Sequence, residues 1–578
     1  MRDYVFKDIT SFDEDFFESD RSISYIGTGS LGGKAKGLAF CSDILQSKIN
    51  HADFSGIEIR IPKMVVILSD VFDSFMQQNN LYEVALSDAP DDRIAMAFQK
   101  AELPFKIPGI LRTFISKIHS PLAIRSSGLL EDSLNEPFAG IYGTKMTPNN
   151  QHDVDTRFRK LIEAIKFVYA STFFKAAKDY MKITDHRTED EKMSVIIQEV
   201  VGSNHGDRFY PEISGTARSY NFYSTGPSKP EDGVVNLALG LGKTIVDGGF
   251  SWSFCPAYPK KPPPFNSVND MLKYTQKEFW SVNLGTPPEY DPVNETEYMV
   301  KSGLSDAESD GTLKHTVSTY DVSSDRVWMG LSGTGPRVLT FAPVLVAREF
   351  PLDDILKNIL NVCVGSLGTP VEIEFAVTLK EPVKQFGFLQ IRPINVSDEE
   401  VNITDEETSS EKCFILSGSI LGNGINSSLH DIVYVDYQEF DNRIPFQIVD
   451  EIEDINKKLV HEKRPYILIG YGRWGTSDPT AGIPVKWNQI SGAKVIVEAP
   501  LEQSFVEMSQ GSHFFHNVTG FRILYFSIVR GPENIFDKEW LARQKILEEK
   551  RFVKHISVKN NLVVKADGRT GKGVILKQ

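Results

Sequence analysis

The segment PLAIRSSGLLEDSLNEPFAGIYGT (residues 121–144) constrains this chain more than any other stretch. Its apolar start, residues 121–124, reads as a short strand that delivers Arg125 into a Ser-Ser-Gly turn, and a carboxylate pair and a Phe-Ala-Gly loop follow. An arginine beside hydroxyls and glycines suits a polyphosphate, because the guanidinium is a planar donor fork and glycines permit close backbone approach. Read alone, the segment fits a surface arginine before two turns equally well.

Composition narrows the class of protein. The 578 residues allow about three to five structural units, each with its own core. The net charge of −14 argues against general nucleic-acid binding, so an anionic ligand must be met by local positive charge. We find no apolar run of membrane-spanning length, no signal-peptide core at the start, and four widely spaced cysteines. We therefore expect a cytoplasmic protein with reduced thiols and no membrane association.

The chain divides into four parts by pattern and composition. Strand-like and helical patterns alternate over 1–190, with a strand expected at 64–68, Ser69 as a helix cap, and a helix over 155–181. A second unit over 191–395 begins at the run SVIIQEVVG and contains a proline-rich insertion at 259–267. An acidic segment, 396–412, is typical of a solvated linker, and the last unit spans 413–578.

Two glycine-rich turns and one strand could each form part of a nucleotide-binding site. GTGSLGGKAKGL (27–38) precedes a helix, where backbone N–H groups and Lys34 or Lys36 can meet a phosphate, although the spacing is not that of a P-loop. The strand at 195–201 carries Gln198 and Glu199 and can offer its edge to a base, or it is a plain core strand. The turn LALGLGKTIVDGG (237–249) follows.

Two neighbouring strands carry the charged residues that decide between these interpretations. Alternation in VEIEFAV places Glu372 and Glu374 on one face, where two carboxylates need solvent, a partner or a cation such as Mg²⁺. In FGFLQIRPI, Gln390 and Arg392 also share a face, so one hairpin can present a metal ligand and a phosphate donor together. Two ordinary amphipathic strands would give the same pattern.

In this order, over residues 27–394, these blocks resemble the ATP-binding domain of the phosphoenolpyruvate synthase and pyruvate phosphate dikinase family. The resemblance implies an ATP-grasp-like, two-lobed domain within a mixed α/β and α+β multidomain chain, with ATP and Mg²⁺ as ligands. It implies Glu374 and Gln390 as the metal site and Arg125 as both a binding and a catalytic residue. It implies nucleotide contacts from Lys34, Arg125, Gln198, Glu199, Gly240, Gly242, Gln390 and Arg392. One departure is Lys243, which stands where the family usually has a glutamate.

The segment QGSHFFHNVTGFRILYF (510–526) places two histidines in an expected aromatic loop before an apolar strand, and such histidines are often structural. The resembled family carries a smaller β/β/α swivelling phosphohistidine domain at this place. The resemblance implies His513 as the carrier and Ser512 as the residue that orients it, with 567–575 as a closing hairpin. Phe514 and Phe515 depart from the small residues of the family, so His516 as the carrier, or no carrier at all, remain alternatives.

These inferences predict an ATP-dependent phosphotransferase of the dikinase type. ATP phosphorylates a carrier histidine, which passes the phosphate to an acceptor that the sequence leaves open: a small molecule, a polysaccharide or a partner protein. No segment resembles the pyruvate-binding (β/α)₈ barrel of the synthase and dikinase members, so we expect that this chain alone does not complete phosphoenolpyruvate synthesis. The alternative is an ATP-binding regulatory or scaffold protein with an inactive phosphohistidine domain.

Overall fold

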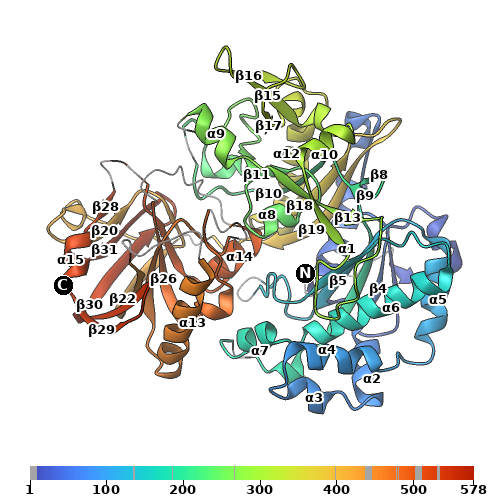
Figure 1. Cartoon of the computed structure of the whole chain (residues 1–578), viewed down its shortest axis with the longest axis horizontal. Helices are drawn as coiled ribbons and strands as arrows, with labels where there is room; N and C mark the ends of the chain where they lie inside the picture. Colours follow the sequence, from blue (N-terminus) through green and yellow to red (C-terminus); the bar gives the residue numbers. More distant parts are fainter. Residues whose placement is uncertain are drawn as a thin grey trace.

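The computed structural model describes residues 9–577 except 134–136, 185, 225, 264, 266, 397–398, 437–444, 477, 479–480, 501–510, 530 and 532–533. Figure 1 shows two adjoining lobes and, beside them, a C-terminal unit built on its own large sheet. Within the described residues, no helix combines the length and the apolar character that crossing a membrane requires.

The first lobe is a mixed sheet with helices packed on it. The strand order is β1 (Thr10–Ser11), β2 (Ile23–Ile26), β4 (Met64–Ile67), β7 (Met193–Glu199), β5 (Leu122–Gly128) and β6 (Thr144–Thr147). The helices of this lobe are α1 (Gly32–Lys48), α2 (Ser69–Gln78), α3 (Tyr82–Leu86), α4 (Asp91–Lys100), α5 (Ile107–Lys117), α6 (Val154–Ser171) and α7 (Lys175–Met181). Helix α6 packs on β5 and β6, and it starts at Asp153, whose carboxylate accepts hydrogen bonds from two backbone N–H groups of the first turn.

The sequence-based expectations for this lobe are partly confirmed. The strand expected at 64–68 is present as β4, but Ser69 is the first residue of α2 and its hydroxyl accepts from the backbone N–H of Ser30 (3.0 Å) instead of capping. The helix expected over 155–181 is two helices, α6 and α7. Strand β5 also continues through Gly128, so Arg125 lies inside the strand and not in a turn, because β7 pairs with it along its whole length.

The second lobe contains an antiparallel sheet that ends in one parallel strand. Its order is β12 (Trp252–Phe254), β11 (Val234–Ala238), β10 (Ile213–Arg218), β18 (Val371–Thr378), β19 (Lys384–Pro393) and β3 (Ile57–Arg60). Two small sheets add β14 (Met299–Gly303), β13 (Glu278–Asn283), β9 (Arg208–Tyr210) and β8 (Ser203–His205), then β16 (Arg326–Met329), β15 (Val317–Asp321) and β17 (Arg337–Leu339). The helices are α8 (Lys243–Val246), α9 (Val268–Tyr274), α10 (Leu304–Ser309), α11 (Ala342–Leu345) and α12 (Leu352–Leu367).

The two lobes exchange strands across the boundary expected at 190/191. Strand β7, which that boundary assigns to the second unit, lies between β4 and β5 in the first sheet, while β3 closes the edge of the second sheet. The physical reason is that both faces of β7 are buried: Val195 and Ile197 join the core of the first lobe, and Ile196 joins the core shared with the second. In the proline-rich insertion, Pro264 and Asn266 lie outside the described residues, and residues 260–262 are exposed.

The C-terminal unit is organised around one large sheet. Its order is β21 (Ile420–Leu421), β27 (Leu524–Ser527), β26 (Ala493–Ala499), β23 (Tyr466–Tyr471), β22 (Gly424–Val435), β30 (Val553–Asp567), β31 (Lys572–Leu576), β20 (Cys413–Ser417) and β28 (Ile535–Phe536), with β29 (Lys545–Glu549) on β30 and a separate pair β24 (Arg473–Trp474) and β25 (Gly482–Ile483). Its helices are α13 (Pro445–His461), α14 (Ser512–Gly520) and α15 (Lys538–Ala542). The hairpin expected at 567–575 is present between β30 and β31.

The described residues of the acidic segment 396–412 contact the C-terminal unit. Residues 397–398 of this segment lie outside the described part of the chain. Glu407 forms an ion pair with Lys565 of β30 (2.6 Å), and Val401 is buried. This segment therefore has contacts of its own with the unit that it precedes.

Helix α14 lies at the junction between the C-terminal sheet and the two lobes (Figure 1). The histidine segment was expected to be a loop, but it is helical and follows Gly511. Phe515 is fully buried, with its ring 5.8 Å from that of Phe222 and the Arg218 guanidinium 3.7 Å above it. Tyr180 donates a hydrogen bond to Asn517 (3.2 Å). The junction thus combines buried aromatic contacts with side-chain hydrogen bonds.

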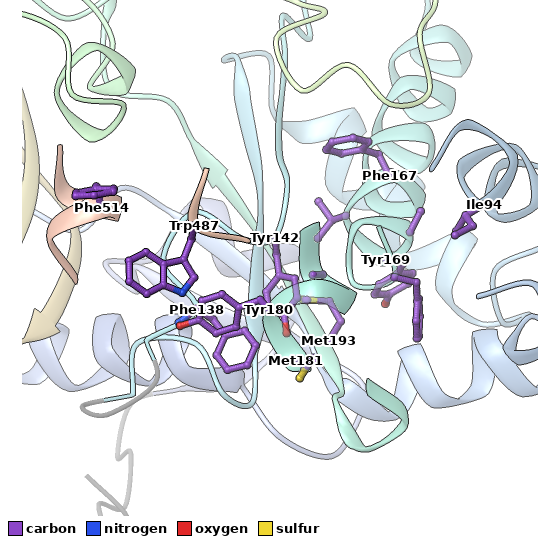
Figure 2. Close-up of a cluster of buried hydrophobic side chains, with 14 of the residues drawn as sticks. Ile94, Phe138, Tyr142, Phe167, Tyr169, Tyr180, Met181, Met193, Trp487 and Phe514 are labelled. Carbon is purple, nitrogen blue, oxygen red and sulfur yellow. The ribbon is translucent and has the colours of Figure 1, made fainter. Parts of the chain in front are cut away.

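Figure 2 shows how the aromatic side chains continue across this junction, from Trp487 and Phe514 to Phe138 and Tyr180. Phe138 belongs to the loop that looked mobile from its sequence, yet its side chain has no exposed surface, and its ring lies 4.4 Å from that of Tyr180. The packing of this loop follows from the docking of α7 and α14 on either side of it.

We predict that Phe515→Ala weakens the docking of α14 and destabilises the protein by about 3–5 kcal/mol, because it removes a fully buried ring. Denaturant unfolding, followed by tryptophan fluorescence, measures the change. Phe105→Ala is the matched control: this side chain is 97% exposed, and its loss should cost less than about 0.5 kcal/mol. Equal effects of the two substitutions would contradict the packing described here.

Candidate functional site

A cavity of about 220 Å³ lies where β5, β7 and β19 meet α8 and α14. Its lining combines apolar and charged side chains. The apolar lining includes Met146, Val200, Val201, Pro211, Leu241, Met299 and Leu389. The charged lining includes Lys34, Arg125, Lys243, Asp247, Glu295, Glu374, Arg392 and His513. The cavity therefore offers a ligand both apolar surface and groups that can bind an anion.

Most of the site residues expected from the sequence line this single cavity. Those in its wall are Lys34, Arg125, Gln198, Glu199, Gly242, Glu374, Gln390, Arg392 and His513. Two do not line it. Gly240 has a positive φ of 80° and packs against Phe279 and Trp280, so its role is to shape the turn before α8. Ser512 is fully buried, and its hydroxyl has no hydrogen-bond partner among the described residues.

Arg125 connects the sheets of the two lobes. Its guanidinium donates to the backbone oxygen of Leu389 (2.8 Å) and to the side-chain oxygens of Gln390 (2.5 Å) and Gln198 (3.2 Å). Burial lowers the pKa of this arginine, and the carboxylate of Glu374, at 3.8 Å, partly offsets the effect. The side chain of Gln198 therefore accepts a hydrogen bond from Arg125 while it lines the cavity.

Lys34 is held at the cavity by buried partners. Its ammonium donates to Glu131 (2.7 Å) and to the hydroxyl of Ser126 (3.0 Å). The glycines before it serve close packing: a Cβ on Gly32 would lie 1.7 Å from the backbone oxygen of Ser127, and Gly32 has a positive φ of 75°. Hydroxyls also accept from the N–H groups of Gly32 and Ala35 at the start of α1. This turn therefore positions Lys34, while the expected cradle of free N–H groups is already partly occupied.

The expected hairpin of β18 and β19 is present, and it aligns the charged residues in pairs. Glu372 lies opposite Arg392, and Glu374 lies opposite Gln390. Arg392 donates to Glu374 (2.8 Å) and to Asp132 (2.8 Å), and Gln390 also donates to Asp132 (2.7 Å). Burial alone would lower the pKa of Arg392, but these carboxylates raise it overall, so the guanidinium stays charged.

Helix α14 presents its two histidines differently. His513 lines the cavity, with Nδ1 4.0 Å from Asp247, and a Cβ on Gly140 would come 2.4 Å from that nitrogen. His516, one turn later, is buried, and its Nε2 lies 2.9 Å from Glu372. Burial lowers the pKa of His513 well below its usual range, and the positive charges of Arg392, Lys34 and Lys243 lower it further. The imidazole that faces the cavity is therefore neutral at pH 7.

Glu372 is the buried partner of His516. Arg218 also donates to it (2.5 Å). Burial would raise the pKa of Glu372, but Arg218 and His516 lower it overall, so this carboxylate is ionised in the docked structure. His516 is accordingly placed as an interdomain contact, and His513 is the histidine with access to the cavity.

At the cavity, the side-chain atoms expected to coordinate a metal ion are the carboxylate oxygens of Glu374 and the amide oxygen of Gln390. Within the described residues there is no group of three or more His, Cys, Asp or Glu side chains arranged to hold a metal alone. Mg²⁺ commonly needs only one or two carboxylates because phosphate oxygens and waters complete its shell. Glu374 fits that chemistry, whereas the side-chain oxygen of Gln390 already accepts from Arg125.

Sequence reasoning gave no role to several residues that shape the site. Glu131 and Asp132 were noted as a carboxylate pair, and they bind Lys34 and Arg392 respectively. Asp247 and Glu295 line the cavity as well. The signal for Asp247 was its spacing of four residues from Lys243, with which it forms an ion pair (2.8 Å), while Glu295 lies in a loop that carries no motif.

We predict that Gly32→Ala displaces α1 from β5 and destabilises the protein by at least about 3 kcal/mol, because the new methyl group meets backbone and the φ is strained. Thermal unfolding with and without ATP reports both stability and the geometry around Lys34. Gly365→Ala in α12 is the matched control: a Cβ there has no atom within 4 Å, and alanine favours the helix. A stable Gly32→Ala protein that binds ATP normally would contradict the close approach.

Comparison with known proteins agrees with this geometry. Residues 28–412 match the family described as pyruvate phosphate dikinase, AMP/ATP-binding domain. A search of curated proteins found no match to the chain. The family match covers more than half of the chain and contains the second lobe and all of the first except β1 and β2. Membership implies ATP binding and dikinase-type chemistry. The chain belongs to the pyruvate phosphate dikinase AMP/ATP-binding domain family.

Proposed function

We propose that this chain is an ATP-dependent phosphotransferase in which ATP phosphorylates His513 and the C-terminal unit carries the phosphoryl group to an acceptor. One observation carries the proposal: His513, which belongs to α14, lies in the wall of the same cavity as Lys34, Arg125 and Arg392 of the family domain. A single ATP molecule in this cavity could therefore contact both the histidine that accepts its phosphoryl group and the cationic side chains that bind its phosphates.

The mixed lining of the cavity suits the two parts of ATP, a flat base and a charged triphosphate. Met146, Leu241 and Met299 supply apolar surface for the base, and Glu199 at the end of β7 forms part of the wall. Lys34 and Arg392 supply positive charge for the phosphates. Mg²⁺, held by Glu374 and phosphate oxygens, would neutralise charge on the transferring group. Gly242 keeps the wall beside α8 free of a side chain.

His513 has the properties of a nucleophile toward phosphorus. Its pKa is lowered by burial and by neighbouring positive charges, so the ring is neutral and a nitrogen lone pair is available. Its side chain keeps about a third of its surface exposed (33%), although the helix that carries it is buried. Arg125 and Arg392 would stabilise the charge that spreads over the transferring phosphoryl oxygens. The hydroxyl of Ser512 is buried at the start of α14 and has no hydrogen-bond partner among the described residues, so we assign this residue to the helix start.

Delivery to an acceptor requires α14 to leave the cavity. The volume of about 220 Å³ is below the roughly 300–1,000 Å³ of usual ligand pockets, so we also expect ATP binding to accompany some opening of the junction. The acidic segment 396–412 joins the two parts and would serve as the hinge. Whether the acceptor is a small molecule, a polysaccharide or a partner protein is left open by the cavity.

The alternative is a regulatory or scaffold protein that binds ATP without the relay. Phe514, Phe515 and Lys243 favoured it because they depart from the family pattern. Phe514 packs at the junction beside Trp487 (ring centroids 6.3 Å apart), and Phe515 packs beside Phe222. Lys243 pairs with Asp247. The two phenylalanines therefore have a packing role and Lys243 has an ion-pair role. Both roles are compatible with an active relay, so these residues do not favour the scaffold alternative.

We predict that incubation with Mg²⁺ and ATP labelled at the β or γ position gives acid-labile label on the wild-type protein. His513→Ala should abolish this label. His516→Ala should lower it only partly, because that substitution weakens docking without removing the nucleophile. Wild-type protein that binds ATP and takes no label would support the scaffold alternative. Label that survives His513→Ala and is lost in His516→Ala would identify His516 as the carrier.

We also predict that the rate of His513 phosphorylation changes little between pH 6 and pH 8. A histidine with its usual pKa of about 6.5 would lose roughly three quarters of its neutral form on acidification to pH 6. Because the pKa of His513 is lowered well below that value, its ring stays neutral over the whole interval. Rapid-quench measurement of the first turnover at saturating ATP tests this. A rate that rises with a midpoint near pH 6.5 would contradict the docked environment described for His513.

A further inference from the structure

Asp247 lies beside the ring of His513 but belongs to a different domain. It follows α8 directly, lines the cavity, and its Oδ1 is 4.0 Å from Nδ1 of His513. Its Oδ2 is 2.8 Å from the ammonium of Lys243, one helical turn earlier. Both the Asp247 carboxylate (28%) and the His513 ring (33%) keep some exposed surface, so a small adjustment can bring them into hydrogen-bond contact.

The docking of α14 fixes the relative position of these two residues. Gly248, which follows Asp247, has a positive φ of 73°, and a Cβ on Gly511 would lie 2.4 Å from the backbone nitrogen of Gly248. The hydroxyl of Thr476 donates to the backbone oxygen of Gly248 (3.0 Å). The turn that carries Asp247 is therefore the surface on which the start of α14 is seated.

Three of the other charged side chains near the ring are positive, and the carboxylates of Glu295 and Glu374 also line the cavity. Arg392, Lys34 and Lys243 lower the pKa of His513. A ring that bonds to phosphorus through one nitrogen becomes more positive, and these neighbours oppose that change. A carboxylate hydrogen-bonded to the second ring nitrogen offsets this positive charge. The same hydrogen bond fixes which nitrogen carries the proton.

We propose that Asp247 is the positioning residue of His513: its carboxylate accepts the Nδ1–H and leaves the lone pair of Nε2 directed at the nucleotide. This inference rests on the proposed function and adds the residue that orients the nucleophile. Lys243 begins α8 and Asp247 follows the helix, so their ion pair holds a carboxylate at the turn beside His513.

The step balances without a further reactant. The Nε2 lone pair forms the N–P bond, and the bond between that phosphorus and its bridging oxygen breaks. The leaving phosphate group takes that electron pair. The proton on Nδ1 stays in the hydrogen bond to Asp247, whose negative charge offsets the positive charge of the phosphorylated ring.

The tautomer of His513 tests this inference apart from activity. Protein labelled with ¹⁵N in its histidines is measured by NMR without ATP at pH 8, and His513→Gln assigns the signal. We expect the Nδ1–H form in the wild type and a shift toward the Nε2–H form in Asp247→Asn. An Nε2–H ring in the wild type, or an unchanged tautomer in Asp247→Asn, would overturn the assignment.

Phosphorylation gives the second readout. Asp247→Asn should slow labelling of His513 by roughly 10- to 100-fold at unchanged affinity for ATP, and Asp247→Glu should recover part of the rate. Glu453→Gln is the matched control, since it removes an interdomain ion pair to Lys175 (3.5 Å) that belongs to a different contact. A similar loss in Glu453→Gln would show that Asp247 acts only through docking. Absence of label in the wild type would contradict the proposed function itself, while the tautomer still decides the role of Asp247.

Discussion

Two buried arginines determine how the rest of this structure is arranged. Arg125 and Arg392 lie on strands of different sheets, and neither has enough solvent to stabilise its charge. A buried charge is tolerated only when carboxylates and hydrogen bonds surround it. Asp132, Glu372 and Glu374 meet this requirement for Arg392. Asp132 after β5 and the β18–β19 hairpin take part in that compensation, and Glu372 extends it to His516 of α14.

Compensation of charge also explains why the cavity can receive a polyphosphate. In the absence of a nucleotide, Glu131 and Glu374 balance Lys34 and Arg392. Phosphate oxygens can take over the same donors, and a cation can then take over the released carboxylate. Under the proposed function, the site is an ion-pair network whose partners would exchange when ATP binds, and the network keeps the charged donors compensated beforehand.

The junction with α14 joins this network to the C-terminal unit. His516 reaches Glu372 from the C-terminal unit, so one carboxylate contacts both Arg218 of the second lobe and a histidine of α14. Aromatic packing around Phe515 adds the apolar part of the interface. An interface of this mixed kind can dock and separate during a reaction cycle.

Much of the site could be predicted from the sequence because its charged residues lie on regular strands. Alternation placed Glu374, Gln390 and Arg392 correctly on one hairpin, since side chains on a strand repeat every second residue. The exchange of β3 and β7 between lobes was not predictable, because local pattern does not specify which sheet a buried strand joins. The same holds for α14, whose helix is stabilised by docking of Phe515, and for Glu295, which is brought to the cavity by a loop.

Under the proposed function, the phosphates of ATP and the ring of His513 occupy one cavity at the same time. A crystal structure with a non-hydrolysable ATP analogue and Mg²⁺ tests this directly. We expect the base against the apolar side chains of Leu241 and Met299, and a β- or γ-phosphorus within about 3.5 Å of Nε2 of His513 in the docked state. An analogue bound outside this cavity, or bound within it while His513 stays docked and its ring points away from every phosphorus, would show that the proposed function is wrong.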